Sequence, residues 1–309
     1  MAMPPRVTIL TRPQACGLGI ALAKKSFDVI RGAPAGAHRT LILSTIHGLR
    51  ATGVRVSVNP AVIKGNAILV AGGIQTLRDA IKRRSKGQKV VALPSTFTSN
   101  DEMAISLHSK EMRADLCIVA SPHIIPSIVR SHPEVADVIE AWPAGTDLQF
   151  WSARQQEKDA VMVYFKGHLA PEHMLETTLT CLRDRKEKSI VVRYGDYTPK
   201  QYRAALRRSR YSVFINGPES QGLALAEAWA CDVPTVVWLN ASLTHPSHPA
   251  PFLSPTTGRL HPESDDLRKT ISAMLEQHEL APRRWMEKNQ SLHKAGTNLL
   301  SLLRTRGIL

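Results

Sequence analysis

Glu219 and Glu227 are separated by seven residues, and the segment between them has the composition of a site for a phosphate-bearing ligand. A helix is predicted from about residue 223 to 231, directly after the turn that contains Gly222. The first N–H groups of a helix have no partner within it and lie at the positive end of its dipole, so they favour phosphate. Gly222 lets a ligand approach the backbone closely. The sequence therefore predicts an anion site at the start of this helix.

Glu227 is the only charged residue between Ser220 and Cys231, in a helix that is apolar nearly all round. A buried carboxylate is costly unless it is paired, hydrogen-bonded or neutral. One interpretation is that a structural partner holds Glu227, or that it reaches solvent at the end of the helix. The other is that it faces a ligand cleft, which the predicted anion site supports. The residues alone leave both open.

The elements around these glutamates are a strand, a loop, a helix and a strand. Residues 211–215 are apolar, β-branched and aromatic, which predicts a short buried strand closed by Asn216-Gly217-Pro218. A second strand at 234–239 follows the helix almost at once. A unit of this order is typical of a parallel sheet in an α/β protein.

The stretch PESQGLALAEAWACDVPTVVW resembles the Glu-x7-Glu signature of retaining glycosyltransferases of the GT-B fold, family 4 above all. This chain has Ser220-Gln221 where the family has Gly-Phe, and Asp232 where a glycine is common. The residues that match the family pattern are Glu219, Gly222, Leu223, Glu227, Ala228, Ala230 and Pro234. The flanking strand, glycine and proline make this resemblance more specific than the spacing of two glutamates alone.

The resemblance implies roles for these residues. Glu219 would contact the donor sugar near the reacting centre, and Glu227 would hold the ribose hydroxyls of the nucleotide. The amides of the run Ser220-Gln221-Gly222-Leu223 and the side chain of Lys166 would bind the phosphates of the donor. These groups would stabilise the charge that develops on the leaving diphosphate, so the resemblance implies no metal and no cofactor.

The composition is that of a soluble globular protein. The chain has 309 residues, enough for two domains, with 43% hydrophobic and 21% charged residues. It has no apolar run near the roughly 20 residues that span a bilayer. Its first residues lack the apolar core of a signal peptide. We therefore expect a cytoplasmic protein, with a peripheral position on the inner face of a membrane as the alternative.

The cysteines and histidines do not indicate a metal site. The four cysteines lack a CxxC spacing, lie mostly in apolar contexts and are predicted to be free buried thiols: Cys16, Cys117, Cys181 and Cys231. His245 and His248 are the pair closest to a metal-ligand spacing, but their Pro- and Ser-rich loop offers no third ligand. We expect no bound metal.

Positive charge is concentrated in the first third of the chain. The whole chain has a net charge of +14, and residues 1–100 account for +13 of it, with 15 Lys and Arg against two acids. The segment from Arg78 to Lys89 alone has six basic residues and one acid. A solvated helix face is the simpler interpretation of that segment. The segregation across the chain favours an acidic partner, which would be an anionic membrane, an acidic glycan or, less favoured, nucleic acid.

The first domain is predicted to start with a strand at 6–10 and a loop containing Gly17 and Gly19. A glycine-rich turn at this place can let a sugar or phosphate reach the backbone, although a plain tight turn is the alternative. In the resembled family a glycine loop here lines the cleft. The sequence predicts further helices at 20–30, 40–51, 76–86 and 124–131, and further strands at 54–58, 67–71, 90–93, 116–120 and 135–141.

Two segments of this domain have a predicted role. The polar loop at 96–101 follows a strand end and would contact an acceptor, or cap a helix. Pro143, Gly145 and Asp147, followed by Phe150, resemble the hinge between the two domains of the family. We therefore place an acceptor-side domain at 1–148 and a nucleotide-sugar-binding domain at 149–309.

The second domain departs from the family in its basic residues. Lys166, after a strand at 160–165, can stand for the first of two diphosphate-binding residues, but the chain has Ala170-Pro171-Glu172 where the second is expected. Arg193, at the end of a strand at 189–193, is a substitute candidate or a surface arginine. The remaining helices are predicted at 199–209, 265–278 and 283–303, the last of which could pack back on the first domain. A loop that contains Gly258 and runs from Leu239 to about residue 262 precedes the last two of these helices.

Taken together, the resemblance implies a GT-B protein, with two doubly wound, Rossmann-like α/β domains and the active site in the cleft between them. The implied reaction moves a sugar from a nucleotide-sugar donor to a hydroxyl of a glycan or glycolipid acceptor, as in polysaccharide or lipid-linked glycan synthesis, with retention. A non-catalytic glycosyltransferase-like binding subunit and a glycosyltransferase that acts on DNA are the alternatives.

Overall fold

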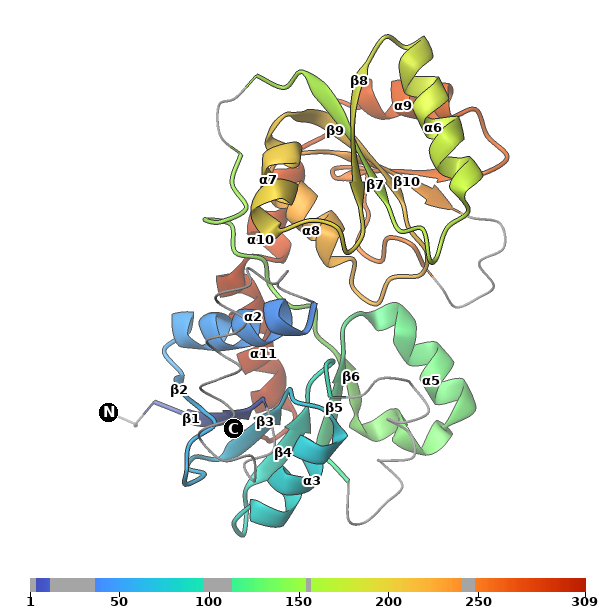
Figure 1. The fold of residues 1–309 in the computed structure, drawn as a ribbon. Helices are drawn as coiled ribbons and strands as arrows, with labels where there is room; N and C mark the ends of the chain where they lie inside the picture. The colour runs from blue at the N-terminus through green and yellow to red at the C-terminus, as the bar shows by residue number, and fades with distance from the viewer. Residues whose placement is uncertain (1–3, 12–36, 97–112, 154–156, 240–247) are drawn as a thin grey trace. The chain divides into compact units, whose positions relative to one another are not determined.

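The structure is a computed structural model that describes residues 4–11, 37–96, 113–153, 157–239 and 248–309 (Figure 1). The chain divides into two compact units: unit 1 consists of Met1–Gly145 with Leu292–Leu309, and unit 2 of Thr146–Ser291. Gly17 and Gly19, the helix predicted at 20–30 and most of the loop at 96–101 lie outside the described residues. None of the described helices has the length and apolar character needed to cross a membrane.

Unit 1 is built on a six-stranded parallel sheet of order β2-β1-β3-β4-β5-β6 (Figure 1). Its central strands are runs of Val, Ile, Leu and Ala that are buried along their length, as expected where helices cover both faces of a parallel sheet. The strands are β1 (Arg6–Leu10), β2 (Arg55–Val58), β3 (Ala67–Val70), β4 (Lys89–Ala92), β5 (Leu116–Val119) and β6 (Ile139–Ala141).

Two apolar cores lie on the two faces of this sheet. Successive side chains of a strand point to opposite faces, so Leu69 joins one core and Val70 the other. The first core is completed by helices α2 (Ala37–Ala51) and α11 (Leu292–Thr305), and the second by α3 (Ile74–Arg83) and α5 (Ile125–Ser131). Two 3-10 segments complete the unit: η1 (Pro122–Ile124) and η2 (Pro133–Val138).

Helices α2 and α11 are far apart in the sequence and pack against each other through glycines. A Cβ atom added at Gly296 would lie 2.0 Å from the carbonyl oxygen of Gly48, so neither position has room for a side chain. Beside this crossing the Trp142 indole N–H donates to the carbonyl of Ala295 at 2.8 Å. The last segment of the chain is therefore part of the core of unit 1.

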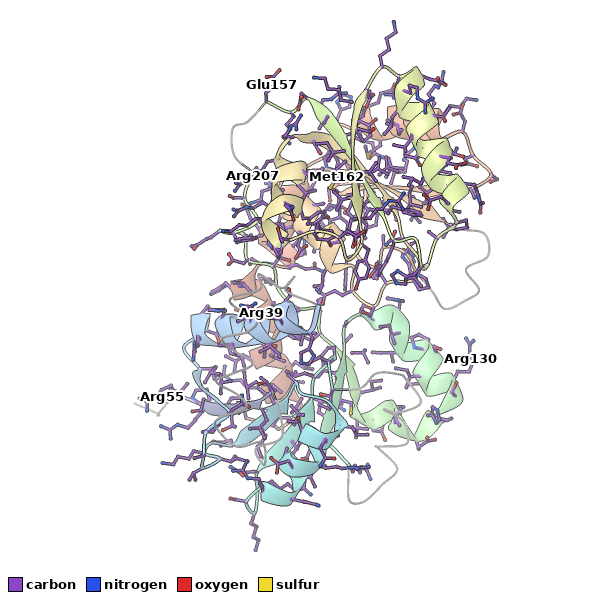
Figure 2. All side chains as sticks on the ribbon, viewed as in Figure 1. Arg39, Arg55, Arg130, Glu157, Met162 and Arg207 are labelled. Atoms are coloured by element: carbon purple, nitrogen blue, oxygen red, sulfur yellow. The ribbon has the colours of Figure 1, made fainter. Side chains whose placement is uncertain are left out.

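Unit 2 is built on a five-stranded parallel sheet of order β11-β10-β9-β7-β8. One face carries a core with α7, α8 and α10, in which Met162 lies (Figure 2), and the other face carries a core with α6 and α9. The strands are β7 (Ala160–Phe165), β8 (Lys188–Arg193), β9 (Ser209–Ile215), β10 (Thr235–Leu239) and β11 (Gly258–Pro262). The helices are α6 (Glu172–Asp184), α7 (Pro199–Arg207), α8 (Leu223–Ala230), α9 (Leu267–Leu275) and α10 (Pro282–Asn289).

The structure corrects the element assignment in three places. The strand predicted at 135–141 is only β6, because Pro133 starts the 3-10 segment η2, a position at which its fixed φ favours a helical turn. The single helix predicted at 283–303 is two, α10 and α11, which separate where Thr146 pairs with Ser291 and its N–H donates to the carbonyl of Gln290. Helix α6 was not predicted.

Candidate functional site

The loop after β9 holds Glu219 firmly at the carboxyl end of the unit 2 sheet. β9 lies between β10 and β7, so the end of this strand is flanked on both sides. The backbone N–H of Glu219 donates to the carbonyl of His248 at 3.0 Å. Asn216, the first residue after the strand, donates its amide to the carbonyl of Pro249 at 2.9 Å and to Glu219 Oε1 at 3.3 Å. Two points of the loop are therefore tied to the segment at 248–249.

Lys166 and Glu219 form an ion pair at this edge. The two side chains come from neighbouring strand ends, because Phe165 of β7 pairs with Ile215 of β9 and Lys166 N–H donates to the carbonyl of Ile215. Lys166 Nζ lies 2.8 Å from Glu219 Oε1, and the side chains are only 13% and 17% exposed. A pair this close and this shielded from water is stronger than one on the surface. It gives the site one fixed cation and one fixed carboxylate.

Gly222 allows the chain to turn from this loop into α8. It has φ 76° and ψ 53°, a left-handed conformation that favours glycine, and no side chain caps the helix there. Of the predicted amide donors, Leu223 is the first residue of α8, Gln221 is buried and Ser220 is exposed. A helix start without a side-chain cap leaves N–H groups for an anion.

Glu227 is half-buried in α8, and within the described residues its carboxylate receives neither a hydrogen bond nor an ion pair. Burial raises the pKa of Glu227 to about 8, so the carboxyl is mostly protonated at neutral pH. The negative charge of ionised Glu227 contributes to raising the pKa values of three tyrosines: Tyr164, Tyr197 and Tyr202. A buried polar group that no described residue satisfies is suited to bind ligand hydroxyls.

These tyrosines form a cluster that the sequence did not reveal. Tyr164 and Tyr197 place their hydroxyl oxygens 3.3 Å apart, and Tyr202 donates its hydroxyl to the carbonyl of Ala224 at 2.8 Å. Burial raises the pKa of Tyr197 to about 12, and the charges of Glu227 and Glu219 act in the same direction. All three hydroxyls are therefore neutral at physiological pH. Because the residues are widely spaced in the chain, only the fold brings them together.

Asn216 was also missed as a site residue. It is 3% exposed, and its side-chain N–H groups serve Pro249 and Glu219, while its Oδ1 atom is buried without a hydrogen-bond partner. Both acceptors face the amide nitrogen, so the orientation of the side chain is fixed by its contacts. The signal in the sequence was the position of an asparagine directly at the strand end, three residues before Glu219.

The remaining predicted residues lie elsewhere. The Arg193 guanidinium donates to Glu172 Oε1 at 2.8 Å and lies over the ring of Phe165, so in this structure it has a surface partner of its own. Gly17 and Gly19 lie outside the described residues. Across the described ranges, no group of three or more His, Cys, Asp or Glu side chains is arranged to hold a metal ion.

Comparison with known proteins identifies the fold. No protein-family model and no curated protein matches the sequence. HepE from Anabaena, solved with UDP and glucose, superposes with a TM-score of 0.60 at 10% identity over 97% of this chain and 99% of that chain. A sucrose-phosphate synthase from Thermosynechococcus elongatus gives a TM-score of 0.57 at 12% identity, over 97% of this chain and 98% of that chain.

A third similar structure is larger than this chain. Accessory secretory protein 1, 2 and 3 from Streptococcus pneumoniae gives a TM-score of 0.53 at 10% identity, over 78% of this chain. This chain spans about half of that one, 52% of its length. At these identities the similarity shows the fold, and it confirms the predicted class: an α/β protein with the GT-B fold of glycosyltransferases.

Proposed function

We propose that the protein is a glycosyltransferase that moves a sugar from a nucleotide-sugar donor to a hydroxyl of an acceptor. The observation that carries this proposal is the shielded Lys166–Glu219 pair at the carboxyl end of β7 and β9. Glu219 lies in the loop that leads into α8, whose start has no side-chain cap. A sugar with a diphosphate leaving group needs both: a carboxylate near the sugar, and cationic or N–H groups for the phosphates.

In this proposal each residue has a separate task. Glu219 contacts the donor sugar, and Lys166 with the amides from Ser220 to Leu223 binds the diphosphate. Glu227 binds the ribose hydroxyls, and Asn216 positions Glu219. The bond between the anomeric carbon and the phosphate oxygen breaks, and a bond from that carbon to the acceptor oxygen forms. The acceptor proton leaves with the nucleoside diphosphate or passes to water.

The finer assignments follow the resemblance to family 4 glycosyltransferases. We propose that the reaction retains the anomeric configuration, needs no metal and uses a glycan or a lipid-linked glycan as acceptor, as in cell-surface polysaccharide synthesis. A uridine diphosphate sugar is the first donor to test, because HepE, which has a similar fold, was solved with UDP and glucose. Arg193 remains a candidate for the diphosphate only if it leaves Glu172 when the donor binds.

A panel of UDP-, GDP-, ADP-, CMP- and dTDP-sugars tests donor binding by the shift in melting temperature. We expect one nucleotide to raise the melting temperature of the wild type and to have little effect on Glu227→Ala. Donor turnover is then compared between the wild type and Glu219→Ala. Turnover that survives in Glu219→Ala would contradict the assignment of this residue, and no shift with any donor would contradict the proposed function.

A non-catalytic binding subunit is the second candidate. One observation favours it: both basic residues predicted for the diphosphate, Lys166 and Arg193, already have carboxylate partners. A subunit of this kind would bind a donor in the melting assay and would show no turnover with any acceptor. Measurement of donor turnover therefore distinguishes the two proposals.

A further inference from the structure

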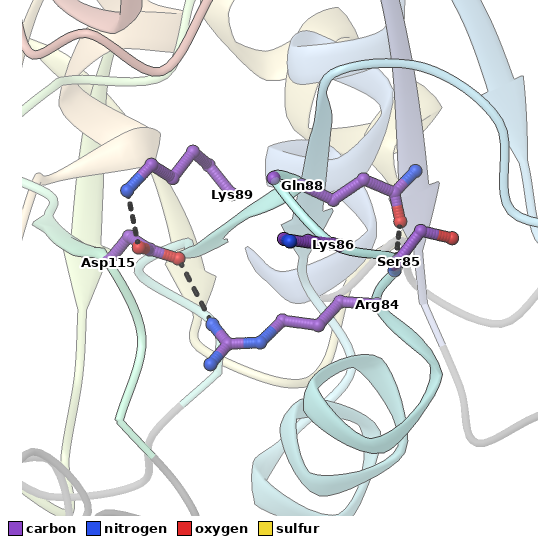
Figure 3. A pocket seen from close by; sticks show the side chains of 7 residues that line it. Arg84, Ser85, Lys86, Gln88, Lys89 and Asp115 are labelled. Atoms are coloured by element: carbon purple, nitrogen blue, oxygen red, sulfur yellow. Dashed lines mark hydrogen bonds and ion pairs between the residues drawn. The ribbon is translucent and has the colours of Figure 1, made fainter.

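The strands of unit 1 begin at an edge of the sheet that is lined with cations. Arg6 and Arg55 are the first residues of β1 and β2 and are direct neighbours in the parallel register. Lys89 is the first residue of β4 (Figure 3), and Lys64 is exposed three residues before β3. We call the cations of this edge the amino-edge row: Arg6, Arg55, Lys64, Arg84, Lys86 and Lys89.

Among the described residues, one carboxylate forms ion pairs with members of this row. Asp115, next to the start of β5, lies 3.4 Å from Arg84 and 3.1 Å from Lys89 (Figure 3). The same carboxylate accepts the backbone N–H of Val90 at 2.8 Å, so part of its role is structural. In the part of the chain that the structure describes, the other four members of the row form no ion pair.

The negative end of a helix dipole does not explain these positions. Cations in the last turn of a helix stabilise its dipole, and Lys82 and Arg83 at the end of α3 fit that explanation. Arg6 stands at the start of β1, and Arg55 lies four residues after the end of α2, beyond the last turn in which the dipole acts (Figure 2 labels Arg55). The helix dipole therefore does not account for these two cations, of which Arg55 is exposed and Arg6 is half-buried.

The equivalent edge of unit 2 serves as an internal comparison. At that edge, Asp159 forms ion pairs with Lys188 at 3.4 Å and with Arg208 at 3.0 Å. Glu187 forms ion pairs with Arg185 at 2.9 Å and with Arg210 at 3.4 Å. At the starts of β7, β8 and β9, these four cations thus each pair with a carboxylate, although the sheet has the same parallel architecture. The unpaired cations of unit 1 are therefore not a requirement of the fold.

An apolar tip stands beside the amino-edge row. Val62, in the loop between β2 and β3, is 64% exposed. The loop is held next to the row, since Arg83 donates to the carbonyl of Ala61 at 2.9 Å and Thr8 donates to the carbonyl of Lys64 at 2.8 Å. An exposed valine gains nothing from a phosphate backbone, but it gains from insertion below lipid headgroups.

Nucleic acid fits the same surface less well. Binding of single strands relies on aromatic side chains on which bases stack. Residues 37–96, which carry the row except for Arg6, contain no Phe, Tyr or Trp. The combination of exposed cations, an apolar tip and no aromatic platform is typical of a surface that binds anionic lipid.

We propose that the amino-edge row and Val62 dock unit 1 on the surface of an anionic phospholipid bilayer. The row lies at the amino ends of the strands, and ligands of open α/β sheets bind at the carboxyl ends. Docking therefore leaves the carboxyl edge of this sheet free. The proposal goes beyond the donor chemistry of unit 2 and requires no donor to be bound.

The test is co-sedimentation of the full chain with vesicles of pure phosphatidylcholine and of phosphatidylcholine with 30% phosphatidylglycerol. We expect binding to the anionic vesicles only, and weaker binding at higher salt. The triple variant Arg55→Gln, Lys64→Gln, Lys86→Gln removes three unpaired cations. It should lower the partition coefficient on the order of a hundredfold, since each cation near an anionic membrane contributes roughly a factor of five.

A matched control removes the same charge from unit 2: Lys200→Gln, Lys269→Gln, Lys288→Gln, three exposed lysines outside the proposed site that form no ion pair with a described residue. This variant should bind vesicles within about twofold of the wild type. If the control loses as much binding as the triple variant of the row, the attraction comes from net charge alone and the proposed surface is wrong. The same holds if the wild type ignores anionic vesicles.

Val62→Ser separates the bilayer from other polyanions. It should weaken vesicle binding roughly fivefold, because part of a valine side chain no longer enters the apolar layer, and should leave retention on duplex DNA unchanged. Tight DNA binding with vesicle binding indifferent to Val62 would overturn the choice of a membrane. Donor binding, measured by melting temperature without vesicles, is independent of all these outcomes, so failure of one proposal is distinguishable from failure of the other.

Discussion

The site at the end of β9 and the amino-edge row use charge in opposite ways. Lys166 and Glu219 are shielded, paired at 2.8 Å and held by backbone contacts on both sides. The cations of the row are mostly exposed and unpaired within the described residues. A shielded pair acts through geometry over a few ångströms, whereas exposed cations act through a field that salt screens within about 10 Å at 0.1 M. Donor turnover should therefore resist moderate salt, and vesicle binding should not.

Lys166→Met should break the first half of this comparison with the largest effect. It removes the cation that we propose binds the diphosphate, and it leaves the Glu219 carboxylate shielded without its partner. We expect donor turnover to fall by about 10²- to 10³-fold, the range found when one charge-stabilising group is removed. Vesicle binding should be unchanged, since Lys166 is not part of the row. Steady-state turnover of the donor found in the melting panel is the measurement.

The matched control is Lys200→Met, which removes an exposed lysine at the start of α7. It should retain turnover within about twofold of the wild type. If Lys166→Met also retains turnover, Lys166 is a structural partner of Glu219 and the site must bind diphosphate through other groups.

Most of the fold was predictable because its strands are buried. Continuous apolar runs such as 160–165 and 211–215 favour a central parallel strand; β7 has the predicted bounds, and β9 starts two residues before its predicted start. Helix α6 was missed because its threonines have low helix propensity. The structure shows how the helix tolerates one of them: Thr178 donates its hydroxyl to the carbonyl of Met174 and is buried.

The candidate site was predictable only in part. The spacing of Glu219, Gly222 and Glu227 along one loop and helix is local, so the sequence could suggest a role for each. The ion pair of Lys166 with Glu219 depends on β7 lying beside β9, which no local pattern specifies. The tyrosine cluster around Glu227 has the same origin, because its members come from different elements. Contacts across the sheet are the information that a single sequence lacks.

Gly296→Ala should destabilise unit 1, which carries the amino-edge row, and should leave the candidate site in unit 2 intact. The added Cβ would lie 2.0 Å from the Gly48 carbonyl oxygen, so α2 and α11 must move apart. We expect a loss of about 3 kcal/mol in the stability of unit 1, the upper end of the usual cost of overpacking. Donor binding by unit 2, measured as isothermal heat below the first unfolding transition, should persist. Calorimetric scanning should show an earlier first transition.

Gly307→Ala is the control for this change. Its φ is +62°, but no atom lies within 4 Å of an added Cβ, so it tests backbone strain without a clash. Its cost should be about 1 kcal/mol. Equal destabilisation by both variants would mean that the glycine crossing is not tight in solution.

Glu227→Gln should make the melting temperature less dependent on pH between pH 7 and 9. Burial raises the pKa of Glu227 to about 8, above its value in the unfolded chain. The folded state therefore holds this proton more tightly. The contribution of the protonated carboxyl to the free energy of unfolding is complete below the unfolded pKa of about 4.3 and is lost as pH rises through 8.

The melting temperature of the wild type should fall between pH 7 and 9 by more than that of Glu227→Gln, which has no proton to lose. The neighbouring tyrosines stay neutral in this range because burial raises their pKa values. Parallel pH profiles of the two proteins would show that Glu227 titrates normally.

Asn216→Ala should give the smallest of these effects and the most specific. The substitution removes one hydrogen bond to Glu219 and one to the carbonyl of Pro249, and so loosens the carboxylate without changing charge. The expected loss is roughly fivefold in donor turnover, since the hydrogen bond to Glu219 contributes about 1 kcal/mol. Asn289→Ala removes a similar amide-to-carbonyl bond, to Trp285 in α10, and serves as the control that should not affect turnover.

A positioning role predicts that kcat falls more than the affinity for the nucleotide, because Glu219 is assigned to the sugar and Glu227 to the ribose. If affinity falls and kcat does not, the unpartnered Oδ1 atom of Asn216 contacts the donor itself, and the residue belongs to binding instead of positioning.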